Sequence, residues 1–345
     1  MDSVLHYSAP SRGYLPGEVI ERDVQAVDGA LLGSVCFTVG TSPGSGYAGQ
    51  VYRAAAQQPG PLPPVVALKV LRPRSRLKNF IREALFELCF QSVFAPRLRE
   101  EAVQAGLLWQ MLLRAAVEAE FGLSGAVARP YGYFWDPSLA SYVEVHEWVA
   151  GRPVRYEPDD TLLARLFGRP RPSPDTEMAR KKRFMDSLAG LCRRMGALGM
   201  ARQFDWYTLV SQSNVLTIDQ TSGENPGPPA SAGQPAAGLT AVDCRPGLAV
   251  PFFLPVSPAH ARVILDGLRR GVLVHYAEAD FVRLAAYLDS HPALTGLRPL
   301  AEQLMRADSA IRGSLPDLWH TRTRLLRSAA FRAAVFQAAA LDWER

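Results

Sequence analysis

Apolar and small residues alternate at residues 31–53 near the N-terminus, and residues 65–71 form a compact apolar run with one lysine embedded in it. The first stretch is interrupted at residues 40–49 by a bend rich in glycine and serine, and a turn rich in proline and glycine separates it from the second. Alternation bounded by such turn residues is typical of β-strands. We therefore predict strand, tight loop and strand, followed by a third strand over residues 65–71.

Helical periodicity begins at residue 79 and continues to residue 121, with a break near residues 94–96 that predicts two helices with a proline joint. Two further strand-like segments follow, at 127–134 and 141–149. This order of strands, helices and strands predicts a small antiparallel lobe over residues 31–150.

Beyond about residue 160 the pattern becomes mostly helical, which predicts a second, helical lobe over residues 151–345. Its strongest periodicity lies at residues 178–199, 258–270, 278–289 and 317–342. Residues 221–238 are rich in Gly, Pro, Ser and Ala and lie between short apolar strands, so we predict a flexible surface loop there. The expected fold class is α+β with two lobes.

Composition adds few constraints to this picture. The 345 residues are 48% hydrophobic and 21% charged, with a net charge of +5, which suits a globular protein with an anionic ligand but predicts neither nucleic acid nor membrane as a partner. The four cysteines are far apart, without the spacing of zinc sites or disulfide frameworks. The chain lacks a signal-peptide pattern and any run of roughly 18 apolar residues, so we expect a cytoplasmic protein without a transmembrane segment.

The glycine-rich bend has the spacing Gly44-x-Gly46-x-x-Gly49-x-Val51. Glycines at such places let the backbone approach phosphate oxygens and present N–H groups to them, although any flexible turn can produce the same pattern. A dinucleotide-binding loop would open a helix, and a Walker loop would end in Gly-Lys-Ser or Gly-Lys-Thr. Here the loop leads into another strand, which leaves a phosphate-covering loop between two strands.

Lys69 lies within the apolar third strand. Its burial is costly unless the ammonium group meets an anion, whereas an edge-strand lysine could instead extend into water. A nearby helix is expected to supply a glutamate partner. We favour Glu101, with Glu87 and Glu83 as alternatives.

Three further segments complete the candidate site. Residues 147–149, Glu147-Trp148-Val149, end the last strand of the small lobe, where backbone groups could meet an adenine edge. Asn214 and Asp243 flank the hairpin of the flexible loop, and a carboxamide with a carboxylate suits Mg²⁺, which prefers oxygen ligands. A turn asparagine and a surface aspartate are the alternative interpretation.

In this order, the motifs resemble those of the protein-kinase-like superfamily, and more closely its atypical AarF/UbiB-type branch, over about residues 35–250. The segments that resemble the branch start at Gly49 (Gly-Gln-Val-Tyr-Arg-Ala), Val66 (Val-Ala-Leu-Lys-Val-Leu-Arg-Pro) and Glu147 (Glu-Trp-Val-Ala-Gly). The resemblance implies ATP held by the glycine loop, Ala67, Lys69 and the 147–149 segment, and Mg²⁺ held by Asn214 and Asp243.

Three departures from the family pattern affect this expectation. The loop keeps three glycines where the AarF/UbiB-type proteins have an alanine-rich loop. The catalytic loop lacks His-Arg-Asp, and its nearest upstream acid is Asp205, which could be either the base or a structural carboxylate. Asp243 is followed by Cys-Arg-Pro-Gly in place of Phe-Gly.

The sequence therefore predicts an atypical kinase or ATPase with ATP and Mg²⁺ as cofactors. Its acceptor would be a small molecule, a lipid precursor or a protein, and the alternative is a pseudokinase-type nucleotide-binding or interaction scaffold without phosphotransfer. His146 is expected to be a satisfied strand histidine. The basic, amphipathic stretch at 322–336 is expected to pack on the helical lobe as a terminal helix, with a membrane surface as the less favoured alternative.

Overall fold

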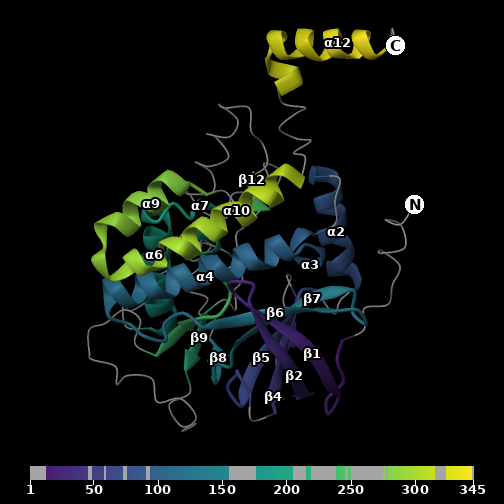
Figure 1. Ribbon diagram of the computed structural model, residues 1–345. Helices are drawn as coiled ribbons and strands as arrows, with labels where there is room; N and C mark the ends of the chain where they lie inside the picture. Colours follow the sequence, from purple (N-terminus) through teal and green to yellow (C-terminus); the bar gives the residue numbers. More distant parts are fainter. Residues whose placement is uncertain are drawn as a thin grey trace, which may run out of the picture.

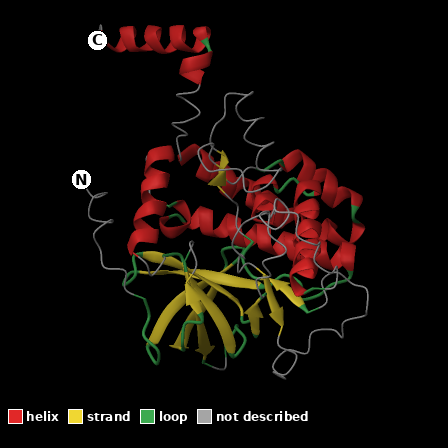
Figure 2. Ribbon diagram, turned by 180° about the vertical axis from the view of Figure 1, so that it is seen from behind, coloured by secondary structure: helices red, strands yellow, loops and turns green. Residues whose placement is uncertain are grey.

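A computed structural model gives the fold (Figure 1). It describes residues 13–45, 49–57, 60–72, 76–90, 94–154, 176–204, 215–218, 238–244, 248–249, 275–276, 279–314 and 324–343. Figure 2 shows most of the strands gathered on one side of the molecule and the helices on the other. The predicted α+β architecture, an N-terminal antiparallel sheet followed by a mostly helical part, is confirmed.

The N-terminal sheet closes into a barrel. Its strands are β1 (Val19–Ala26), β2 (Leu31–Val39), β3 (Gly44–Ser45), β4 (Gln50–Ala56), β5 (Val65–Val70), β6 (Pro130–Asp136) and β7 (Ser141–Glu147). Their order is β2-β1-β6-β7-β5-β4-β3, and β2 also pairs with β4. Every pairing is antiparallel. Because β2 pairs with β4, six strands form a closed ring, and the short strand β3 lies outside this ring and pairs with β4. A closed ring leaves no long unpaired edge among these six strands.

Alternation along the strands separates an apolar interior from a polar outer face. The residues of β5 and β7 that point into the barrel are Val66, Leu68, Val70, Val143 and Val145, all buried in one apolar cluster with Phe37 and Phe134. Because successive side chains point to opposite faces of a strand, the intervening positions of β5 and β7 point outward. The outer face of these two strands is where the candidate site lies.

Strand β1 was not anticipated from the sequence. Charged side chains at positions 21–23 obscure its alternation, and one of them, Arg22, forms an ion pair of 3.0 Å with the fully buried Asp136 of β6. The Tyr14 hydroxyl donates a hydrogen bond of 2.6 Å to the same carboxylate. These contacts fix the first strand against the sixth, where the ring closes.

Three helices connect β5 to β6: α2 (Arg76–Phe90), α3 (Ala95–Leu98) and α4 (Glu100–Phe121). The predicted proline joint is present, because Pro96 lies in the first turn of α3. Helix α4 ends at Gly122, whose φ of 64° is a left-handed conformation that suits glycine. Much of α4 is buried, since it packs against α10 and α6 as well as against β6 and β7.

The C-terminal part is mostly helical. Its helices are α6 (Glu177–Arg194), α7 (Leu198–Phe204), α9 (Phe281–Ser290), the 3-10 helix η2 (Pro292–Leu297), α10 (Arg298–Ser314) and α12 (Ala329–Trp343). A small sheet of order β10-β9-β8 contains β8 (Gly151–Pro153), β9 (Val215–Ile218) and β10 (Leu239–Ala241), and β11 (Leu248–Ala249) pairs with β12 (His275–Tyr276). The two strands predicted around the flexible loop are present as β9 and β10. The loop itself, apart from Gly238, and the helix predicted at 258–270 lie outside the described residues.

Helix α12 does not pack as expected. Figures 1 and 2 show it standing clear of the other helices. Its residue Phe336 is 71% exposed, and Leu326, which precedes the helix, is 80% exposed. The expectation of a terminal helix docked on the helical part is therefore not met. A search of the described helices for one long and apolar enough to span a membrane finds none.

Candidate functional site

The site is centred on an ion pair between the barrel and the helical part. Lys69 lies on β5, where it faces Val51 of β4 on one side and Glu144 of β7 on the other. Its Nζ atom is 2.8 Å from Oδ1 of Asp243, a residue 174 positions along the chain. Both side chains are largely buried, with 10% of the lysine and 20% of the aspartate exposed. The lysine in the apolar strand therefore has an anionic partner.

Asp243 is positioned by the strand that precedes it. Ala241 at the end of β10 exchanges backbone hydrogen bonds with the segment before β6: its N–H donates to Ala126 and its carbonyl accepts from Ala128. The Thr240 hydroxyl also donates to the Gly125 carbonyl. These bonds hold the end of β10 against the segment that leads into the barrel. The carboxylate that follows is thereby brought to Lys69.

Cys244 replaces the phenylalanine expected after this aspartate. Its thiol is buried, and burial together with the neighbouring carboxylate of Asp243 raises its pKa well above the ordinary value. The thiol is therefore neutral at physiological pH. It packs as a small apolar group beside the ion pair.

Parts of the glycine loop are brought to the same face of the barrel. Gly44 pairs with Val51 across the β3–β4 hairpin, and Val51 pairs with Lys69, so Gly44 lies two strands from the lysine in the same sheet. A Cβ atom on Gly49 would lie 2.1 Å from the Val70 carbonyl oxygen, so this position requires glycine because β5 passes so closely. Gly46 lies outside the described residues.

The remaining nucleotide-binding positions surround the lysine. Ala67 faces outward on β5, opposite His146 of β7. Glu147 ends β7, where its carboxylate accepts the Arg129 N–H at 2.9 Å and pairs with Arg114 at 3.2 Å. Its own N–H donates to the Arg129 carbonyl. Trp148 and Val149 then lead into β8, and the Arg53 guanidinium lies 5.9 Å from the centre of the Trp148 ring.

None of the three helix glutamates contacts Lys69 in the part of the chain that the structure describes. Glu101 and Glu87 are exposed on their helices. Glu83 is buried, but it accepts hydrogen bonds from Arg82 at 2.8 Å and from the Phe94 N–H at 2.7 Å. The expected pair of Lys69 and Glu101 is therefore not formed in this structure, in which the lysine pairs with Asp243.

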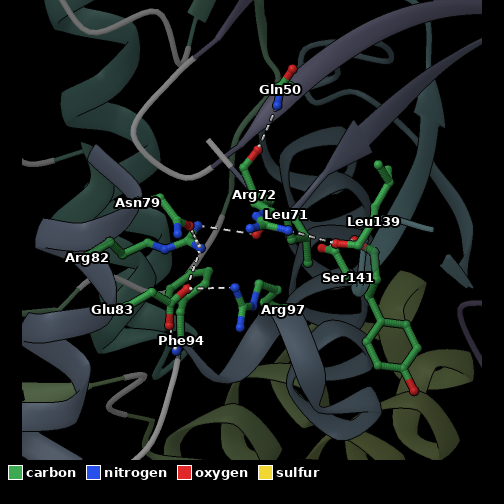
Figure 3. Close-up of polar contacts among 11 residues, drawn as sticks. Gln50, Leu71, Arg72, Asn79, Arg82, Glu83, Phe94, Arg97, Leu139 and Ser141 are labelled. Atoms are coloured by element: carbon green, nitrogen blue, oxygen red, sulfur yellow. Dashed lines mark hydrogen bonds and ion pairs between the residues drawn. The ribbon is translucent and has the colours of Figure 1, made fainter. Parts of the chain in front are cut away.

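Glu83 belongs to a buried arginine cluster shown in Figure 3. Arg97 approaches the same carboxylate oxygen at 3.5 Å, and Arg82 also donates to the Leu71 carbonyl at 3.2 Å. Arg72, two residues after the end of β5, has a lowered pKa because it is buried and lies near Arg97. The cluster joins helix α2 to the end of the strand that carries Lys69.

A second polar group lies on the outer face of β7. Glu144 and His146 are both buried, and His146 Nε2 is 2.9 Å from the Glu144 carboxylate. The other ring nitrogen, Nδ1, is 3.4 Å from Nε2 of Gln110 on α4. The histidine is thus satisfied, as expected. Glu144 was missed, although the sequence holds a signal for it: polar residues at 144 and 146 alternate with valines in a central strand.

Two predicted residues of the site, the candidate base Asp205 and the candidate metal ligand Asn214, lie outside the described residues. A cavity of about 690 Å³ on the wall of the barrel has a different lining, which includes Glu21, Trp135 and Tyr142. It contains neither Lys69 nor Asp243.

Comparison with known proteins finds only distant structural likenesses. No family model matches the chain, and no curated protein matches it. Among solved structures, the BubR1 kinase domain matches with 14% identity and a TM-score of 0.33, over 70% of this chain and 55% of that one. The PknI kinase domain of Mycobacterium tuberculosis matches with 14% identity and a TM-score of 0.31, over 70% and 66%. A rhoptry antigen kinase domain specific to Toxoplasma gondii matches with 12% identity and a TM-score of 0.32, over 95% and 79%.

Likenesses this distant carry over no activity or substrate. They give no support to the AarF/UbiB-type branch in particular. The class rests on the chain's own architecture: an N-terminal antiparallel sheet with a lysine on a central strand, followed by a mostly helical part with an aspartate that meets this lysine. The fold is α+β, with an N-terminal antiparallel sheet followed by a mostly helical part.

Proposed function

We propose that this chain binds Mg²⁺-ATP between the barrel and the helical part and acts as an atypical kinase or ATPase. The observation that carries the proposal is the ion pair between Lys69 and Asp243. In phosphoryl-transfer sites of the kinase kind, a strand lysine neutralises phosphate oxygens and an aspartate holds the metal. Here the lysine on β5 and the aspartate that follows β10 supply the two groups that this chemistry needs.

The residues present fit a magnesium ion. A carboxylate oxygen is the hard ligand that Mg²⁺ prefers, and the ion commonly uses one or two carboxylates together with phosphate oxygens of the nucleotide. Among the described residues no group of three or more His, Cys, Asp and Glu side chains could hold a metal. The proposed ion therefore depends on Asp243, on phosphate oxygens and on the predicted ligand Asn214, and it would neutralise phosphate charge.

The proposal assigns each group a task. Lys69 and Asp243 neutralise each other without ligand, and the nucleotide would take over both charges, its phosphates meeting the lysine and its metal the aspartate. Val51 and Ala67 lie on the face around the lysine, and the backbone of 147–149 would meet the adenine edge. Asp205 is the proposed base. The acceptor would be a small molecule, a lipid precursor or a protein.

Thermal unfolding tests the binding step. Mg²⁺-ATP should raise the Tm of the wild-type chain, and Lys69→Met should abolish the rise because the phosphates lose their cation. Arg298→Met is the matched control, since it removes an exposed arginine that pairs with Asp289 outside the site. Its Tm should respond to Mg²⁺-ATP as the wild type does. A wild-type Tm that Mg²⁺-ATP leaves unchanged would contradict the proposal.

A scaffold that binds nucleotide or only a protein partner, without phosphotransfer, is the second candidate. The buried neutral Cys244 beside Asp243, where kinases carry Phe-Gly, favours it, as does the missing His-Arg-Asp. Hydrolysis of ATP separates the two candidates. Turnover that is lost in Asp243→Ala supports the enzyme, whereas ATP binding with no turnover supports the scaffold.

A further inference from the structure

We infer that Glu144 is the carboxylate that holds the Lys69 ammonium in place when Asp243 binds the metal, and that it is a positioning residue of the nucleotide site. The inference rests on the proposed function. It gives the role expected of a helix glutamate to a residue of the neighbouring strand, β7.

The strand register places Glu144 beside the lysine. Lys69 and Glu144 are directly opposite each other in the antiparallel pair of β5 and β7. Opposite residues share a face, and their Cβ atoms are about 4.5–5.5 Å apart. Both side chains point away from the barrel interior, because their neighbours Val70 and Val143 point into it. The carboxylate and the ammonium group are thus within reach of each other.

A fixed hydrogen-bond chain orients Glu144. The Gln110 amide nitrogen donates to the Ala128 carbonyl at 2.7 Å, which determines which end of the amide faces His146. The same nitrogen is 3.4 Å from His146 Nδ1, so Nδ1 is the acceptor and the ring proton is on Nε2. Nε2–H then donates to Glu144 at 2.9 Å. The Nε2 side of His146 thus orients the Glu144 side chain.

Burial strengthens the attraction between this carboxylate and a nearby ammonium group. Glu144 is 3% exposed, and charges removed from water are screened less than charges at the surface. A lysine ammonium has three donors, so Lys69 can bind a phosphate oxygen and Glu144 at the same time. The helix candidates are differently placed: Glu83 is engaged by Arg82 and the Phe94 N–H, and Glu101 is exposed.

A double-mutant cycle on Mg²⁺-ATP affinity tests the inference. Isothermal titration would give the Kd of the wild type, Glu144→Gln, Lys69→Met and the double variant. Glu144→Gln should weaken binding about tenfold, and it should change the Kd by less than about twofold when Lys69 is already methionine, because coupled residues act non-additively. Glu101→Gln is the matched control and should leave the Kd within about twofold of the wild-type value.

The outcomes separate this inference from the function on which it rests. A wild-type chain that binds no Mg²⁺-ATP overturns both. Binding that depends on Lys69 but loses the same factor from Glu144→Gln in both backgrounds overturns only the role of Glu144, because a merely structural residue would give such additivity. If the effect of Glu101→Gln on the Kd depended on Lys69, the role of Glu144 would also be overturned. Should Glu144→Gln fail to fold, Glu144→Asp keeps the charge on a shorter side chain, and the cycle is run with it.

Discussion

The Nζ atom of Lys69 lies 2.8 Å from Oδ1 of Asp243, and this pair joins the antiparallel barrel to the helical part of the chain. The lysine is positioned by the pairing of β5 with β4 and β7, and the aspartate by the end of β10. Two independent parts of the fold therefore supply one charge each to the same place.

Asp205→Asn tests the proposed base. A general base contributes about 10²–10⁴-fold to the rate of the step that it assists, so phosphotransfer or hydrolysis should fall by roughly 100-fold. The Kd for Mg²⁺-ATP should stay within about twofold, because the base contacts the acceptor hydroxyl and not the phosphates. Steady-state turnover and titration of the same variant measure the two effects. Equal turnover in the variant and the wild type would exclude Asp205 as the base.

Asp136→Asn tests the closure of the barrel. Burial alone would raise the pKa of Asp136, but hydrogen bonds from Ser138 and Tyr14 and the charge of Arg22 outweigh it and lower the pKa below its ordinary value. Because the folded pKa lies below the unfolded one, the stability from Asp136 is full above the unfolded pKa of about 4 and is lost as the pH falls through the folded value. The variant should be about 3 kcal/mol less stable than the wild type at pH 7.

Denaturant unfolding at several pH values measures this difference. The gap in the free energy of unfolding between wild type and variant should narrow as the pH falls below about 4. A gap that is constant with pH would show that the charge of Asp136 does not contribute.

Gly49→Ala tests whether the fold requires glycine at this position. The new Cβ would lie 2.1 Å from the Val70 carbonyl oxygen, so β4 and β5 must move apart, and we expect a loss of about 2 kcal/mol or more. Gly106→Ala is the matched control. It lies in helix α4 with open space around its Cβ position, and alanine should stabilise the helix by about 0.5–1 kcal/mol. Opposite shifts in Tm are expected, and a Gly49→Ala variant as stable as the wild type would contradict the close approach.

Glu83→Gln tests the arginine cluster. The substitution leaves Arg82 and Arg97 buried without their carboxylate, and Arg97 already has two nitrogen atoms, Nε and Nη2, without a hydrogen-bond partner. We expect a loss of about 3 kcal/mol in unfolding experiments, whereas the exposed Glu87→Gln should change stability by less than about 0.5 kcal/mol. If Glu83→Gln kept its stability but lost ATP affinity, Glu83 and not Glu144 would be the partner of Lys69.

The sequence predicts most of the barrel because its strands alternate clearly and their turns contain glycine and proline. Strand β7 is clear for this reason, whereas β5 is predicted as a short apolar run between turns, in which Lys69 stands out as the one charge. Strand β1 is not predicted from the sequence, because the inward-facing Arg22 interrupts the apolar alternation. The partner of Arg22, Asp136, is 114 residues away. Local periodicity carries no information about such a distant partner.

The partner of Lys69 also depends on contacts between segments that are distant in the sequence. Helix glutamates were considered because α2 and α4 follow β5 in the sequence, but Lys69 meets Asp243 through the pairing of β10 with β9 and with the segment before β6. Glu144 is placed beside Lys69 by strand register, which depends on how β5 pairs with β7. Neither relationship follows from spacing along the chain.

Isothermal titration of ATP in the presence and absence of Mg²⁺ tests the central claim most directly, with wild type compared to Asp243→Asn. The account predicts one saturable site per wild-type chain, with an affinity that falls at least about tenfold when the metal is chelated. In Asp243→Asn the metal should make less than about a twofold difference, because its carboxylate ligand is gone. If the wild-type affinity for ATP did not change with Mg²⁺, or if the wild type did not bind ATP, the account would be contradicted.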